Sequence, residues 1–228
     1  MTAPLRAPAG ASSALLLAAT LMVSPIAAWT DSTGTALPLE LGTGSVLWLE
    51  GTSTVHEFEC RTSQVEIAFT RDTARPLPAD ASGLAELIRG AGVRGVEAQV
   101  PVNSLRSGKE ALDKNLRKAM KAEQHPKVVF VLSRYTLADG APDDTLGIRA
   151  EGSLTIAGTT RPVTLSARAY RSGKGLWLIG DYGLRMSEYG IKPPTMMLGT
   201  LRVGDAIKVG YRLLLVPTAD ASPASSGH

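Results

Sequence analysis

From residue 46 onward, the chain consists mainly of short apolar runs of strand length that are separated by turn-forming residues. Runs of four to eight residues or a little more, rich in Val, Ile, Leu and aromatic residues, are typical of β-strands. The predicted strands cover residues 46–49, 55–60, 65–69, 96–103, 128–137, 146–156, 163–170, 176–186 and 206–216. Most connections between them have hairpin length, which predicts antiparallel pairing.

One predicted strand, residues 96–103, shows the alternation most clearly. Val96, Ala98, Val100 and Val102 fall on one side of an extended chain, and the residues between them are Glu, Gln, Pro and Asn. Because successive side chains of a strand point to opposite faces, this strand has one apolar face and one polar face that suits contact with solvent. The sequence therefore predicts a sheet with an apolar inner side.

One segment, residues 107–124, has the pattern of an α-helix. Ser107 can cap its start, and Glu110 three residues later completes a capping box. A narrow apolar stripe follows at Leu112, Leu116, Ala119 and Met120. The stretch 71–95, which contains prolines and several glycines, predicts a loop with a single helical turn at residues 84–88.

These elements predict an all-β fold with one helix. About eight or nine antiparallel strands either close into a barrel or split into a sandwich, and strand spacing does not choose between the two. The apolar stripe of the helix is narrow, so we expect the helix beside the sheet or capping one opening. Aromatic residues make up 5% of the chain, so aliphatic side chains must fill most of the interior.

The first 28 residues have the three parts of a secretory signal peptide. Arg6 supplies a positive charge, residues 14–23 are apolar, and Ala27 and Ala28 provide a small-residue cleavage site. An uncleaved membrane anchor is the alternative, although the apolar run is short for a membrane span. Nothing else in the sequence is apolar over a sufficient length. We therefore expect a periplasmic or secreted protein without a membrane span after cleavage.

The rest of the chain is expected to hold one folded domain. Residues 29–43, rich in Thr and Gly, predict an extended N-terminal segment, and residues 44–217 predict the β-domain. The tail, residues 218–228, is mostly Ala, Ser and Gly and predicts disorder. The sequence does not decide the oligomeric state, and a homodimer is left open.

The sequence contains no pattern that is typical of an active site. The serine hydrolase, phosphate-loop and dinucleotide-binding motifs are missing. His56, His125 and His228 lack the spacing of a zinc site, and the single cysteine, Cys60, is expected to be a buried thiol. The net charge of +3 is too small to favour nucleic acid as a partner. We also expect no local cluster of Lys and Arg that would favour nucleic-acid binding despite this small net charge. We therefore expect no catalytic residue, metal or cofactor.

Several short motifs follow one another between residues 44 and 216. They are Ser53-Thr54-Val55-His56-Glu57-Phe58, Val100-Pro101-Val102-Asn103-Ser104-Leu105-Arg106-Ser107-Gly108, His125-Pro126-Lys127-Val128-Val129-Phe130, Gly152-Ser153-Leu154-Thr155-Ile156-Ala157-Gly158-Thr159-Thr160-Arg161-Pro162-Val163 and Tyr189-Gly190-Ile191. In this order they resemble the motifs of the YceI-like family of lipid-binding proteins. Two positions depart from the family pattern: Glu50 stands where the family continues apolar, and His125 replaces a common Tyr.

The resemblance implies a lipocalin-like, antiparallel, eight-stranded barrel with a long apolar channel. It also implies a periplasmic or secreted, non-catalytic protein whose ligand is a polyisoprenoid, an isoprenoid quinone or a fatty lipid. A barrel of this size is just wide enough inside for packed side chains or for one ligand. Small inward residues such as Ala98, Gly152 and Ala167 agree with a channel. The alternative is a filled core, which would make the chain a structural or interaction protein.

The alternation also predicts which residues face the ligand. The expected channel lining is Val46, Trp48, Phe58, Ile67, Val100, Val102, Phe130, Leu132, Leu154, Val163, Leu165, Leu178, Ile207 and Val209. Polar residues near strand ends are expected at the channel mouth, where they would meet a head group; they are His56, Arg61, Ser104, Lys109 and Arg185. A shift of one residue in register would reverse the facing of a whole strand.

Overall fold

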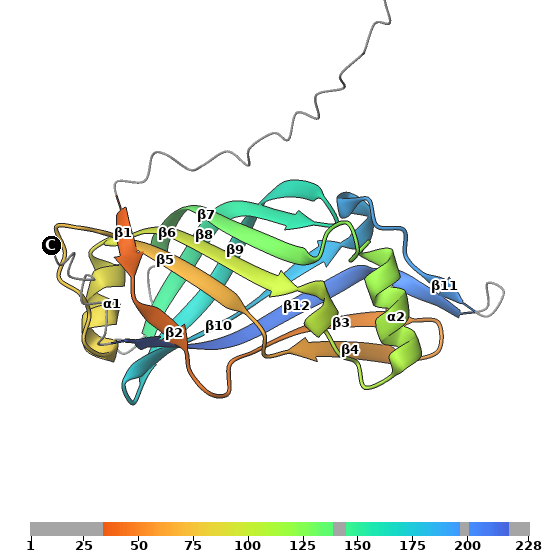
Figure 1. Cartoon of the computed structure of the whole chain (residues 1–228), viewed down its shortest axis with the longest axis horizontal. Helices are drawn as coiled ribbons and strands as arrows, with labels where there is room; N and C mark the ends of the chain where they lie inside the picture. The colour runs from red at the N-terminus through yellow and green to blue at the C-terminus, as the bar shows by residue number, and fades with distance from the viewer. Residues whose placement is uncertain (1–33, 139–144, 197–200, 219–228) are drawn as a thin grey trace, which may run out of the picture. The chain divides into compact units, whose positions relative to one another are not determined.

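The computed structural model describes residues 34–138, 145–196 and 201–218. The predicted signal peptide and the predicted tail after residue 218 lie outside the described residues. Within these ranges, twelve strands form one antiparallel sheet with the order β1-β5-β6-β7-β8-β9-β10-β12-β3-β4, while β2 and β11 each pair with β12. The sheet curls around an apolar interior, and the helices α1 and α2 lie near its opposite ends (Figure 1).

The strands follow the predicted order along the chain. They are β1 (Gly34–Leu37), β2 (Leu39–Leu41), β3 (Val46–Ser53), β4 (Glu57–Thr62), β5 (Glu66–Asp72), β6 (Val93–Pro101), β7 (Lys127–Ala138), β8 (Thr145–Ile156), β9 (Thr159–Ser172), β10 (Gly175–Arg185), β11 (Thr195–Met196) and β12 (Leu201–Pro217). The helices are α1 (Ala81–Arg89) and α2 (Glu110–Ala119), with short 3-10 turns η1 (Val102–Ser104) and η2 (Met186–Tyr189). The antiparallel, lipocalin-like fold is confirmed. The nine predicted strand ranges correspond to β3 to β10 and β12, whereas β1, β2, β11 and the full length of α1 were not predicted. An eight-stranded barrel with one helix was therefore too small a count for the described residues.

The segment before residue 44 belongs to the sheet. It was predicted as an extended stretch outside the domain, but β1 pairs along β5 and β2 pairs with the end of β12. This segment therefore links two strands that do not pair with each other. Leu37 is 4% exposed and packs into the same cluster as α1. The folded domain begins before the predicted boundary because Leu37, Leu39 and Leu41, which alternate with Pro38 and Glu40, pack against the cluster that contains α1. The Thr and Gly content of the segment hid this alternation.

The free edge of β4 is held by the segment that follows β6. Arg61 and Arg106 exchange two backbone hydrogen bonds, with N to O distances of 2.8 and 2.9 Å. Beside them, the Thr62 hydroxyl donates to Ser104 Oγ at 2.8 Å. This short bridge, rather than a full ladder, joins β4 to the far side of the sheet.

Helix α1 fills one end of the curled sheet. Its N-cap is Asp80, whose side chain accepts a hydrogen bond from Gly83 N at 2.8 Å. Its buried residues pack against strands β8, β9, β10 and β12 in a cluster that contains Leu84, Leu87, Ile88, Leu146, Ala169, Leu176 and Leu215. The sequence predicted only one turn here, because the surrounding prolines and glycines hid the cap.

Helix α2 is shorter than the predicted helix and is not held by the predicted capping box. Its N-cap is Lys109, which makes no capping bond through its side chain. Ser107 instead donates two hydrogen bonds to the carboxylate of Asp113, from its backbone N at 2.8 Å and its hydroxyl at 2.6 Å. The contact replaces the predicted cap because Ser107 lies outside the helix.

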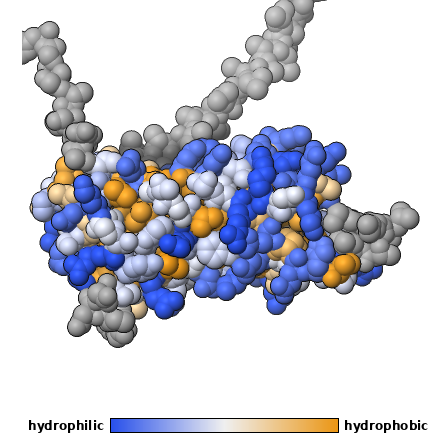
Figure 2. All heavy atoms as spheres, turned by 90° about the horizontal axis from the view of Figure 1, so that it is seen from below, coloured by the Kyte–Doolittle hydropathy of each residue, from blue (hydrophilic) through white to orange (hydrophobic). Residues whose placement is uncertain are grey.

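The described part of the outer surface is mostly polar. On the face seen in Figure 2, hydrophobic residues are scattered singly or in small groups among hydrophilic ones. Isolated apolar residues of this kind are normal on protein surfaces. Most of the apolar side chains of the strands therefore face the interior of the curled sheet.

Candidate ligand-binding cavity

The inside of the curled sheet holds a cavity of about 340 Å³. Its wall extends from Ile88 and Val93 near α1 to Leu116 and Met120 of α2. Most wall residues are aliphatic or aromatic, and none of those described carries a charge. Ligand pockets commonly have volumes of roughly 300 to 1,000 Å³. The cavity is therefore large enough to receive part of an apolar molecule.

The width of the cavity comes from small residues on facing strands. Ala98 of β6, Ala150 of β8 and Ala167 of β9 contribute to its wall. Gly180 of β10 has a different role, because a Cβ atom there would lie 2.3 Å from the hydroxyl oxygen of Tyr211. Glycine at this position lets the Tyr211 ring lie across β10 inside the sheet.

A few polar side chains interrupt the apolar wall. The Tyr211 hydroxyl donates to the Ser166 carbonyl over a long 3.4 Å, and burial raises its pKa to about 12. The Tyr135 hydroxyl donates to the Ile88 carbonyl at 2.9 Å and joins β7 to α1. Tyr182 and Asn115 also contribute to the wall. These side chains offer hydroxyl and amide groups, so the interior provides polar contacts without a cationic countercharge.

Much of the predicted lining lies in the wall of this cavity. The residues that do so are Phe58, Ile67, Val100, Phe130, Leu132, Leu154, Leu165, Leu178, Ile207 and Val209. Some of them, such as Val100, come from strands on which polar and apolar residues alternate, whereas Phe130 and Leu178 lie in runs that are apolar on both faces. Whether they contact a ligand stays a prediction.

Val46 and Trp48 were assigned to the wrong face of β3. Leu47 and Leu49 line the cavity in their place. The Trp48 ring lies against Gly210 on the outside of the sheet, and its indole N–H donates to Glu50 at 2.9 Å. The error arose because this run is apolar on both faces. Glu50, the departure from the family pattern, is therefore an outward residue.

Val102 and Val163 are buried but do not line the cavity. Val102 was expected to continue the alternation of β6, but β6 ends at Pro101 and Val102 begins η1. Val163 lies on β9 opposite Gly152 and is 6% exposed. Both residues are buried among other protein side chains and do not contact the cavity.

Both helices supply wall residues that the sequence did not indicate. Ile88 of α1 is one of them. The apolar cavity-facing residues of α2 are Leu112, Leu116 and Ala119, with Met120 as its C-cap, and Asn115 lies beside them. The stripe on α2 was visible as an amphipathic pattern, but the pattern alone could not show which surface it covers. The cavity is therefore bounded by strands and helices together.

The five predicted mouth residues do not form one group, and none contributes to the cavity wall. Arg61 points outward from β4 and pairs with Glu59, while Arg185 lies on the outer side of β10. Ser104 donates to the Pro101 carbonyl at 2.7 Å, and Lys109 is the exposed N-cap of α2. His56 is exposed in the turn before β4. Strand alternation places Arg61 and Arg185 on the outer face, and the other three residues lie outside the strands. A role of these residues at a channel mouth stays a prediction.

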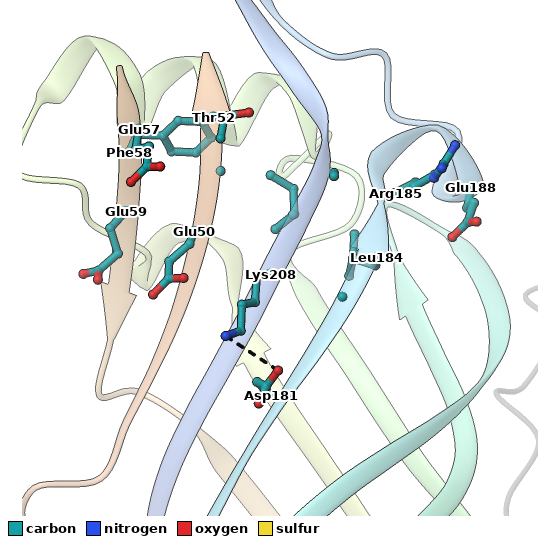
Figure 3. A pocket seen from close by; sticks show the side chains of 14 residues that line it. Glu50, Thr52, Glu57, Phe58, Glu59, Asp181, Leu184, Arg185, Glu188 and Lys208 are labelled. Carbon is teal, nitrogen blue, oxygen red and sulfur yellow. Dashed lines mark ion pairs between the residues drawn. The ribbon is translucent and has the colours of Figure 1, made fainter. Parts of the chain in front are cut away.

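A second, open groove of about 850 Å³ crosses β4, β3, β12 and β10. Glu50, Glu57, Glu59 and Asp181 lie along it, and Lys208 makes an ion pair with Asp181 at 3.7 Å (Figure 3). A surface with this many carboxylates does not suit an apolar molecule. The inner cavity is therefore the better candidate for binding, although the groove is larger.

The described residues show no sign of metal chemistry or of a reactive thiol. No group of three or more His, Cys, Asp or Glu side chains among them could hold a metal ion. Cys60 is fully buried, and burial, with smaller effects from Asp113 and Glu59, raises the pKa of its thiol to about 11. The thiol is therefore protonated at neutral pH. No described helix has the length and apolar character needed to cross a membrane.

Comparison with known structures supports the same fold. BcnA of Burkholderia cenocepacia superposes with a TM-score of 0.58 at 17% identity, covering 77% of this chain and 99% of BcnA. A polyisoprenoid binding domain from Saccharophagus degradans, implicated in plant cell wall breakdown, superposes with a TM-score of 0.56 at 12% identity, covering 80% of this chain and 99% of that domain. At these identities the likeness establishes the fold. No curated protein matches the chain in sequence.

The sequence itself matches the model of the YceI-like domain over residues 46–214. This range contains β3 to β10 and most of β12, which includes nearly all of the cavity wall. The match also covers every motif on which the resemblance was based. The chain therefore belongs to the YceI-like domain family.

Proposed function

We propose that this protein binds a long, uncharged apolar molecule inside the curled sheet and acts as a non-catalytic carrier or store. The observation that carries the proposal is the cavity of about 340 Å³ with its apolar, uncharged wall. Each methylene transferred from water into such a wall contributes about 0.8 kcal/mol. A long hydrocarbon chain would bind tightly without strong hydrogen bonds. A filled core, the alternative, would leave no such cavity.

The wall favours a neutral ligand over an anionic one. Burying an ionised carboxylate or phosphate without a countercharge is very costly, and no described wall residue supplies a cation. Tyr182, Tyr211 and Asn115 could instead meet a carbonyl or hydroxyl group. An isoprenoid quinone or a polyprenyl alcohol fits these conditions better than a fatty acid or a prenyl phosphate.

The comparisons and the sequence support the lipid class and the exported location. The Saccharophagus degradans domain that shares the fold is a polyisoprenoid binding domain. The predicted signal peptide, residues 1–28, agrees with a periplasmic or secreted carrier. An exported carrier of this kind would keep an insoluble molecule out of water between membranes.

Binding inside the sheet can be tested with a variant that fills the cavity. Ala167 lies in the cavity wall, so Ala167→Trp should occupy the space that the ligand needs. Arg168, the next residue of β9, is exposed on the opposite face, and Arg168→Trp is the matched control. Titration with a fluorescent polyprenyl alcohol should show that Ala167→Trp weakens binding at least tenfold and that Arg168→Trp does not.

Two results would count against this function. If circular dichroism shows that both tryptophan variants are folded and both bind the probe equally well, the probe binds outside the cavity. A prenyl phosphate that competes as well as the alcohol of the same chain length would contradict the preference for a neutral ligand.

A further inference from the structure

Positive charge is concentrated on and just before α2. The segment from Arg106 to Lys121 contains six basic and two acidic residues, so its own excess of positive charge exceeds the net charge of +3 of the whole chain. The expectation that the sequence has no Lys/Arg cluster is wrong for this segment. The cluster was hidden because acidic residues elsewhere cancel most of its charge in the total.

The charges lie on the side of α2 that faces away from the cavity. Leu112, Leu116 and Met120 face the cavity. Lys114 and Lys118 lie about half a turn from this stripe, since a helix turns once in about 3.6 residues. Both lysines, and Lys121 just after the helix, are exposed. A single helix therefore has the cavity on one side and cations on the other.

The described acidic residues do not neutralise this surface. Neither Lys114 nor Lys118 makes an ion pair with a described residue. The Asp113 carboxylate is buried and holds the two hydrogen bonds from Ser107. Glu110 is the other acidic residue of α2, at its first turn. The outer face of α2 therefore presents a positive potential to solvent.

We propose that the outer face of α2 is a docking surface for an anionic lipid bilayer. Lys and Arg side chains at a bilayer surface are attracted by anionic head groups, and each adds to the partition free energy. Docking through this face would bring the helical part of the cavity wall against the membrane. The choice of a bilayer over another anionic partner rests on the proposed lipid binding, because an insoluble ligand must come from a membrane and return to one.

The test is co-sedimentation of the full protein with vesicles. One set contains phosphatidylcholine with phosphatidylglycerol, and the other contains phosphatidylcholine alone. The test variant is Lys114→Gln with Lys118→Gln. The matched control is Lys174→Gln with Lys208→Gln, which removes the same charge from the turn between β9 and β10 and from the outer groove.

The protein should bind the phosphatidylglycerol vesicles, and binding should weaken as salt is added. The partition coefficient of the α2 variant should fall roughly 30-fold, because two Lys side chains at an anionic bilayer surface together contribute a free energy of about this size. The partition coefficient of the control should fall much less. Equal loss in both variants, or equal binding to both vesicle types, would overturn the proposal. Charge-dependent binding to polyglutamate without binding to vesicles would overturn it too, and would assign the surface to an acidic protein.

Docking and ligand binding can fail separately. If the α2 variant still takes up fluorescent polyprenyl alcohol but no longer sediments with vesicles, both proposals stand. If the wild-type protein sediments with anionic vesicles but takes up no probe, docking stands and the proposed function fails.

Discussion

At the scale of single residues, Asp113 fixes the position of α2. It is 6% exposed, and its carboxylate accepts two hydrogen bonds from Ser107. Burial by itself would raise the pKa of Asp113, but the bonds from Ser107 and the charges of Arg106 and Arg117 lower it below the ordinary value. The ionised form is therefore favoured in the folded state, and it joins the helix to the segment that holds the edge of β4.

A lowered pKa in the folded state makes this contact dependent on pH. Its contribution is complete above the pKa of an unfolded Asp, about 3.9, and is lost as the pH falls through the lower folded value. Asp113→Asn should therefore cost about 1 to 3 kcal/mol of unfolding free energy at neutral pH and less in acid. Urea titrations at several pH values measure this difference.

Asp205 provides the control, because it accepts the same two kinds of bond from Ser187 on the surface. Asp205→Asn should change stability less than Asp113→Asn. A neutral-pH loss of the same size in both variants would contradict the role assigned to burial.

Cys60 gives a second prediction at this scale. Its thiol has no exposed surface and its pKa is about 11, so little thiolate forms at neutral pH. A thiol reagent such as DTNB should label the native protein very slowly and the denatured protein completely. Rapid labelling without denaturant would show that β4 opens at its edge far more often than its hydrogen bonds imply.

At the scale of elements, α1 stabilises the sheet by filling one of its ends with buried side chains. Leu84 is 1% exposed within the cluster that fills this end of the sheet. Removal of a large buried side chain costs both its transfer free energy and the cavity that it leaves. The helix should therefore contribute strongly to the stability of the whole sheet.

Leu84→Ala should lower the unfolding free energy by about 2 to 5 kcal/mol. Leu77→Ala is the matched control, because Leu77 precedes the same helix but is 46% exposed. It should change stability by less than about 0.5 kcal/mol. Denaturant unfolding measures both, and similar losses in the two variants would show that the packing of α1 in the end of the sheet does not stabilise the fold.

The elements also show what the sequence could predict and what it could not. Clear alternation identified β6 and placed Val100 in the cavity wall. At β3 it failed, since Leu47 and Trp48 are equally apolar and only pairing with β4 and β12 decides their facing. Strands β1 and β2 were missed because they are short, although Leu37, Leu39 and Leu41 alternate with Pro38 and Glu40.

At the scale of the whole molecule, one curled sheet produces both an apolar interior and a polar exterior. The wall of the cavity continues across strands and both helices without a described charge. The groove that holds most of the nearby carboxylates lies on the outer side of the same strands. The alternation of the strands therefore separates an apolar interior from a polar exterior.

The central claim is that this cavity holds a long, uncharged apolar molecule, and mass spectrometry of an organic extract tests it most directly. The folded protein is purified without detergent, and Ala167→Trp is treated in the same way as a control. The wild-type extract should contain a neutral polyisoprenoid or a similar lipid in a fixed ratio to protein, and the Ala167→Trp extract should contain much less. An extract without lipid from wild-type protein that also takes up no polyprenyl alcohol would contradict the claim.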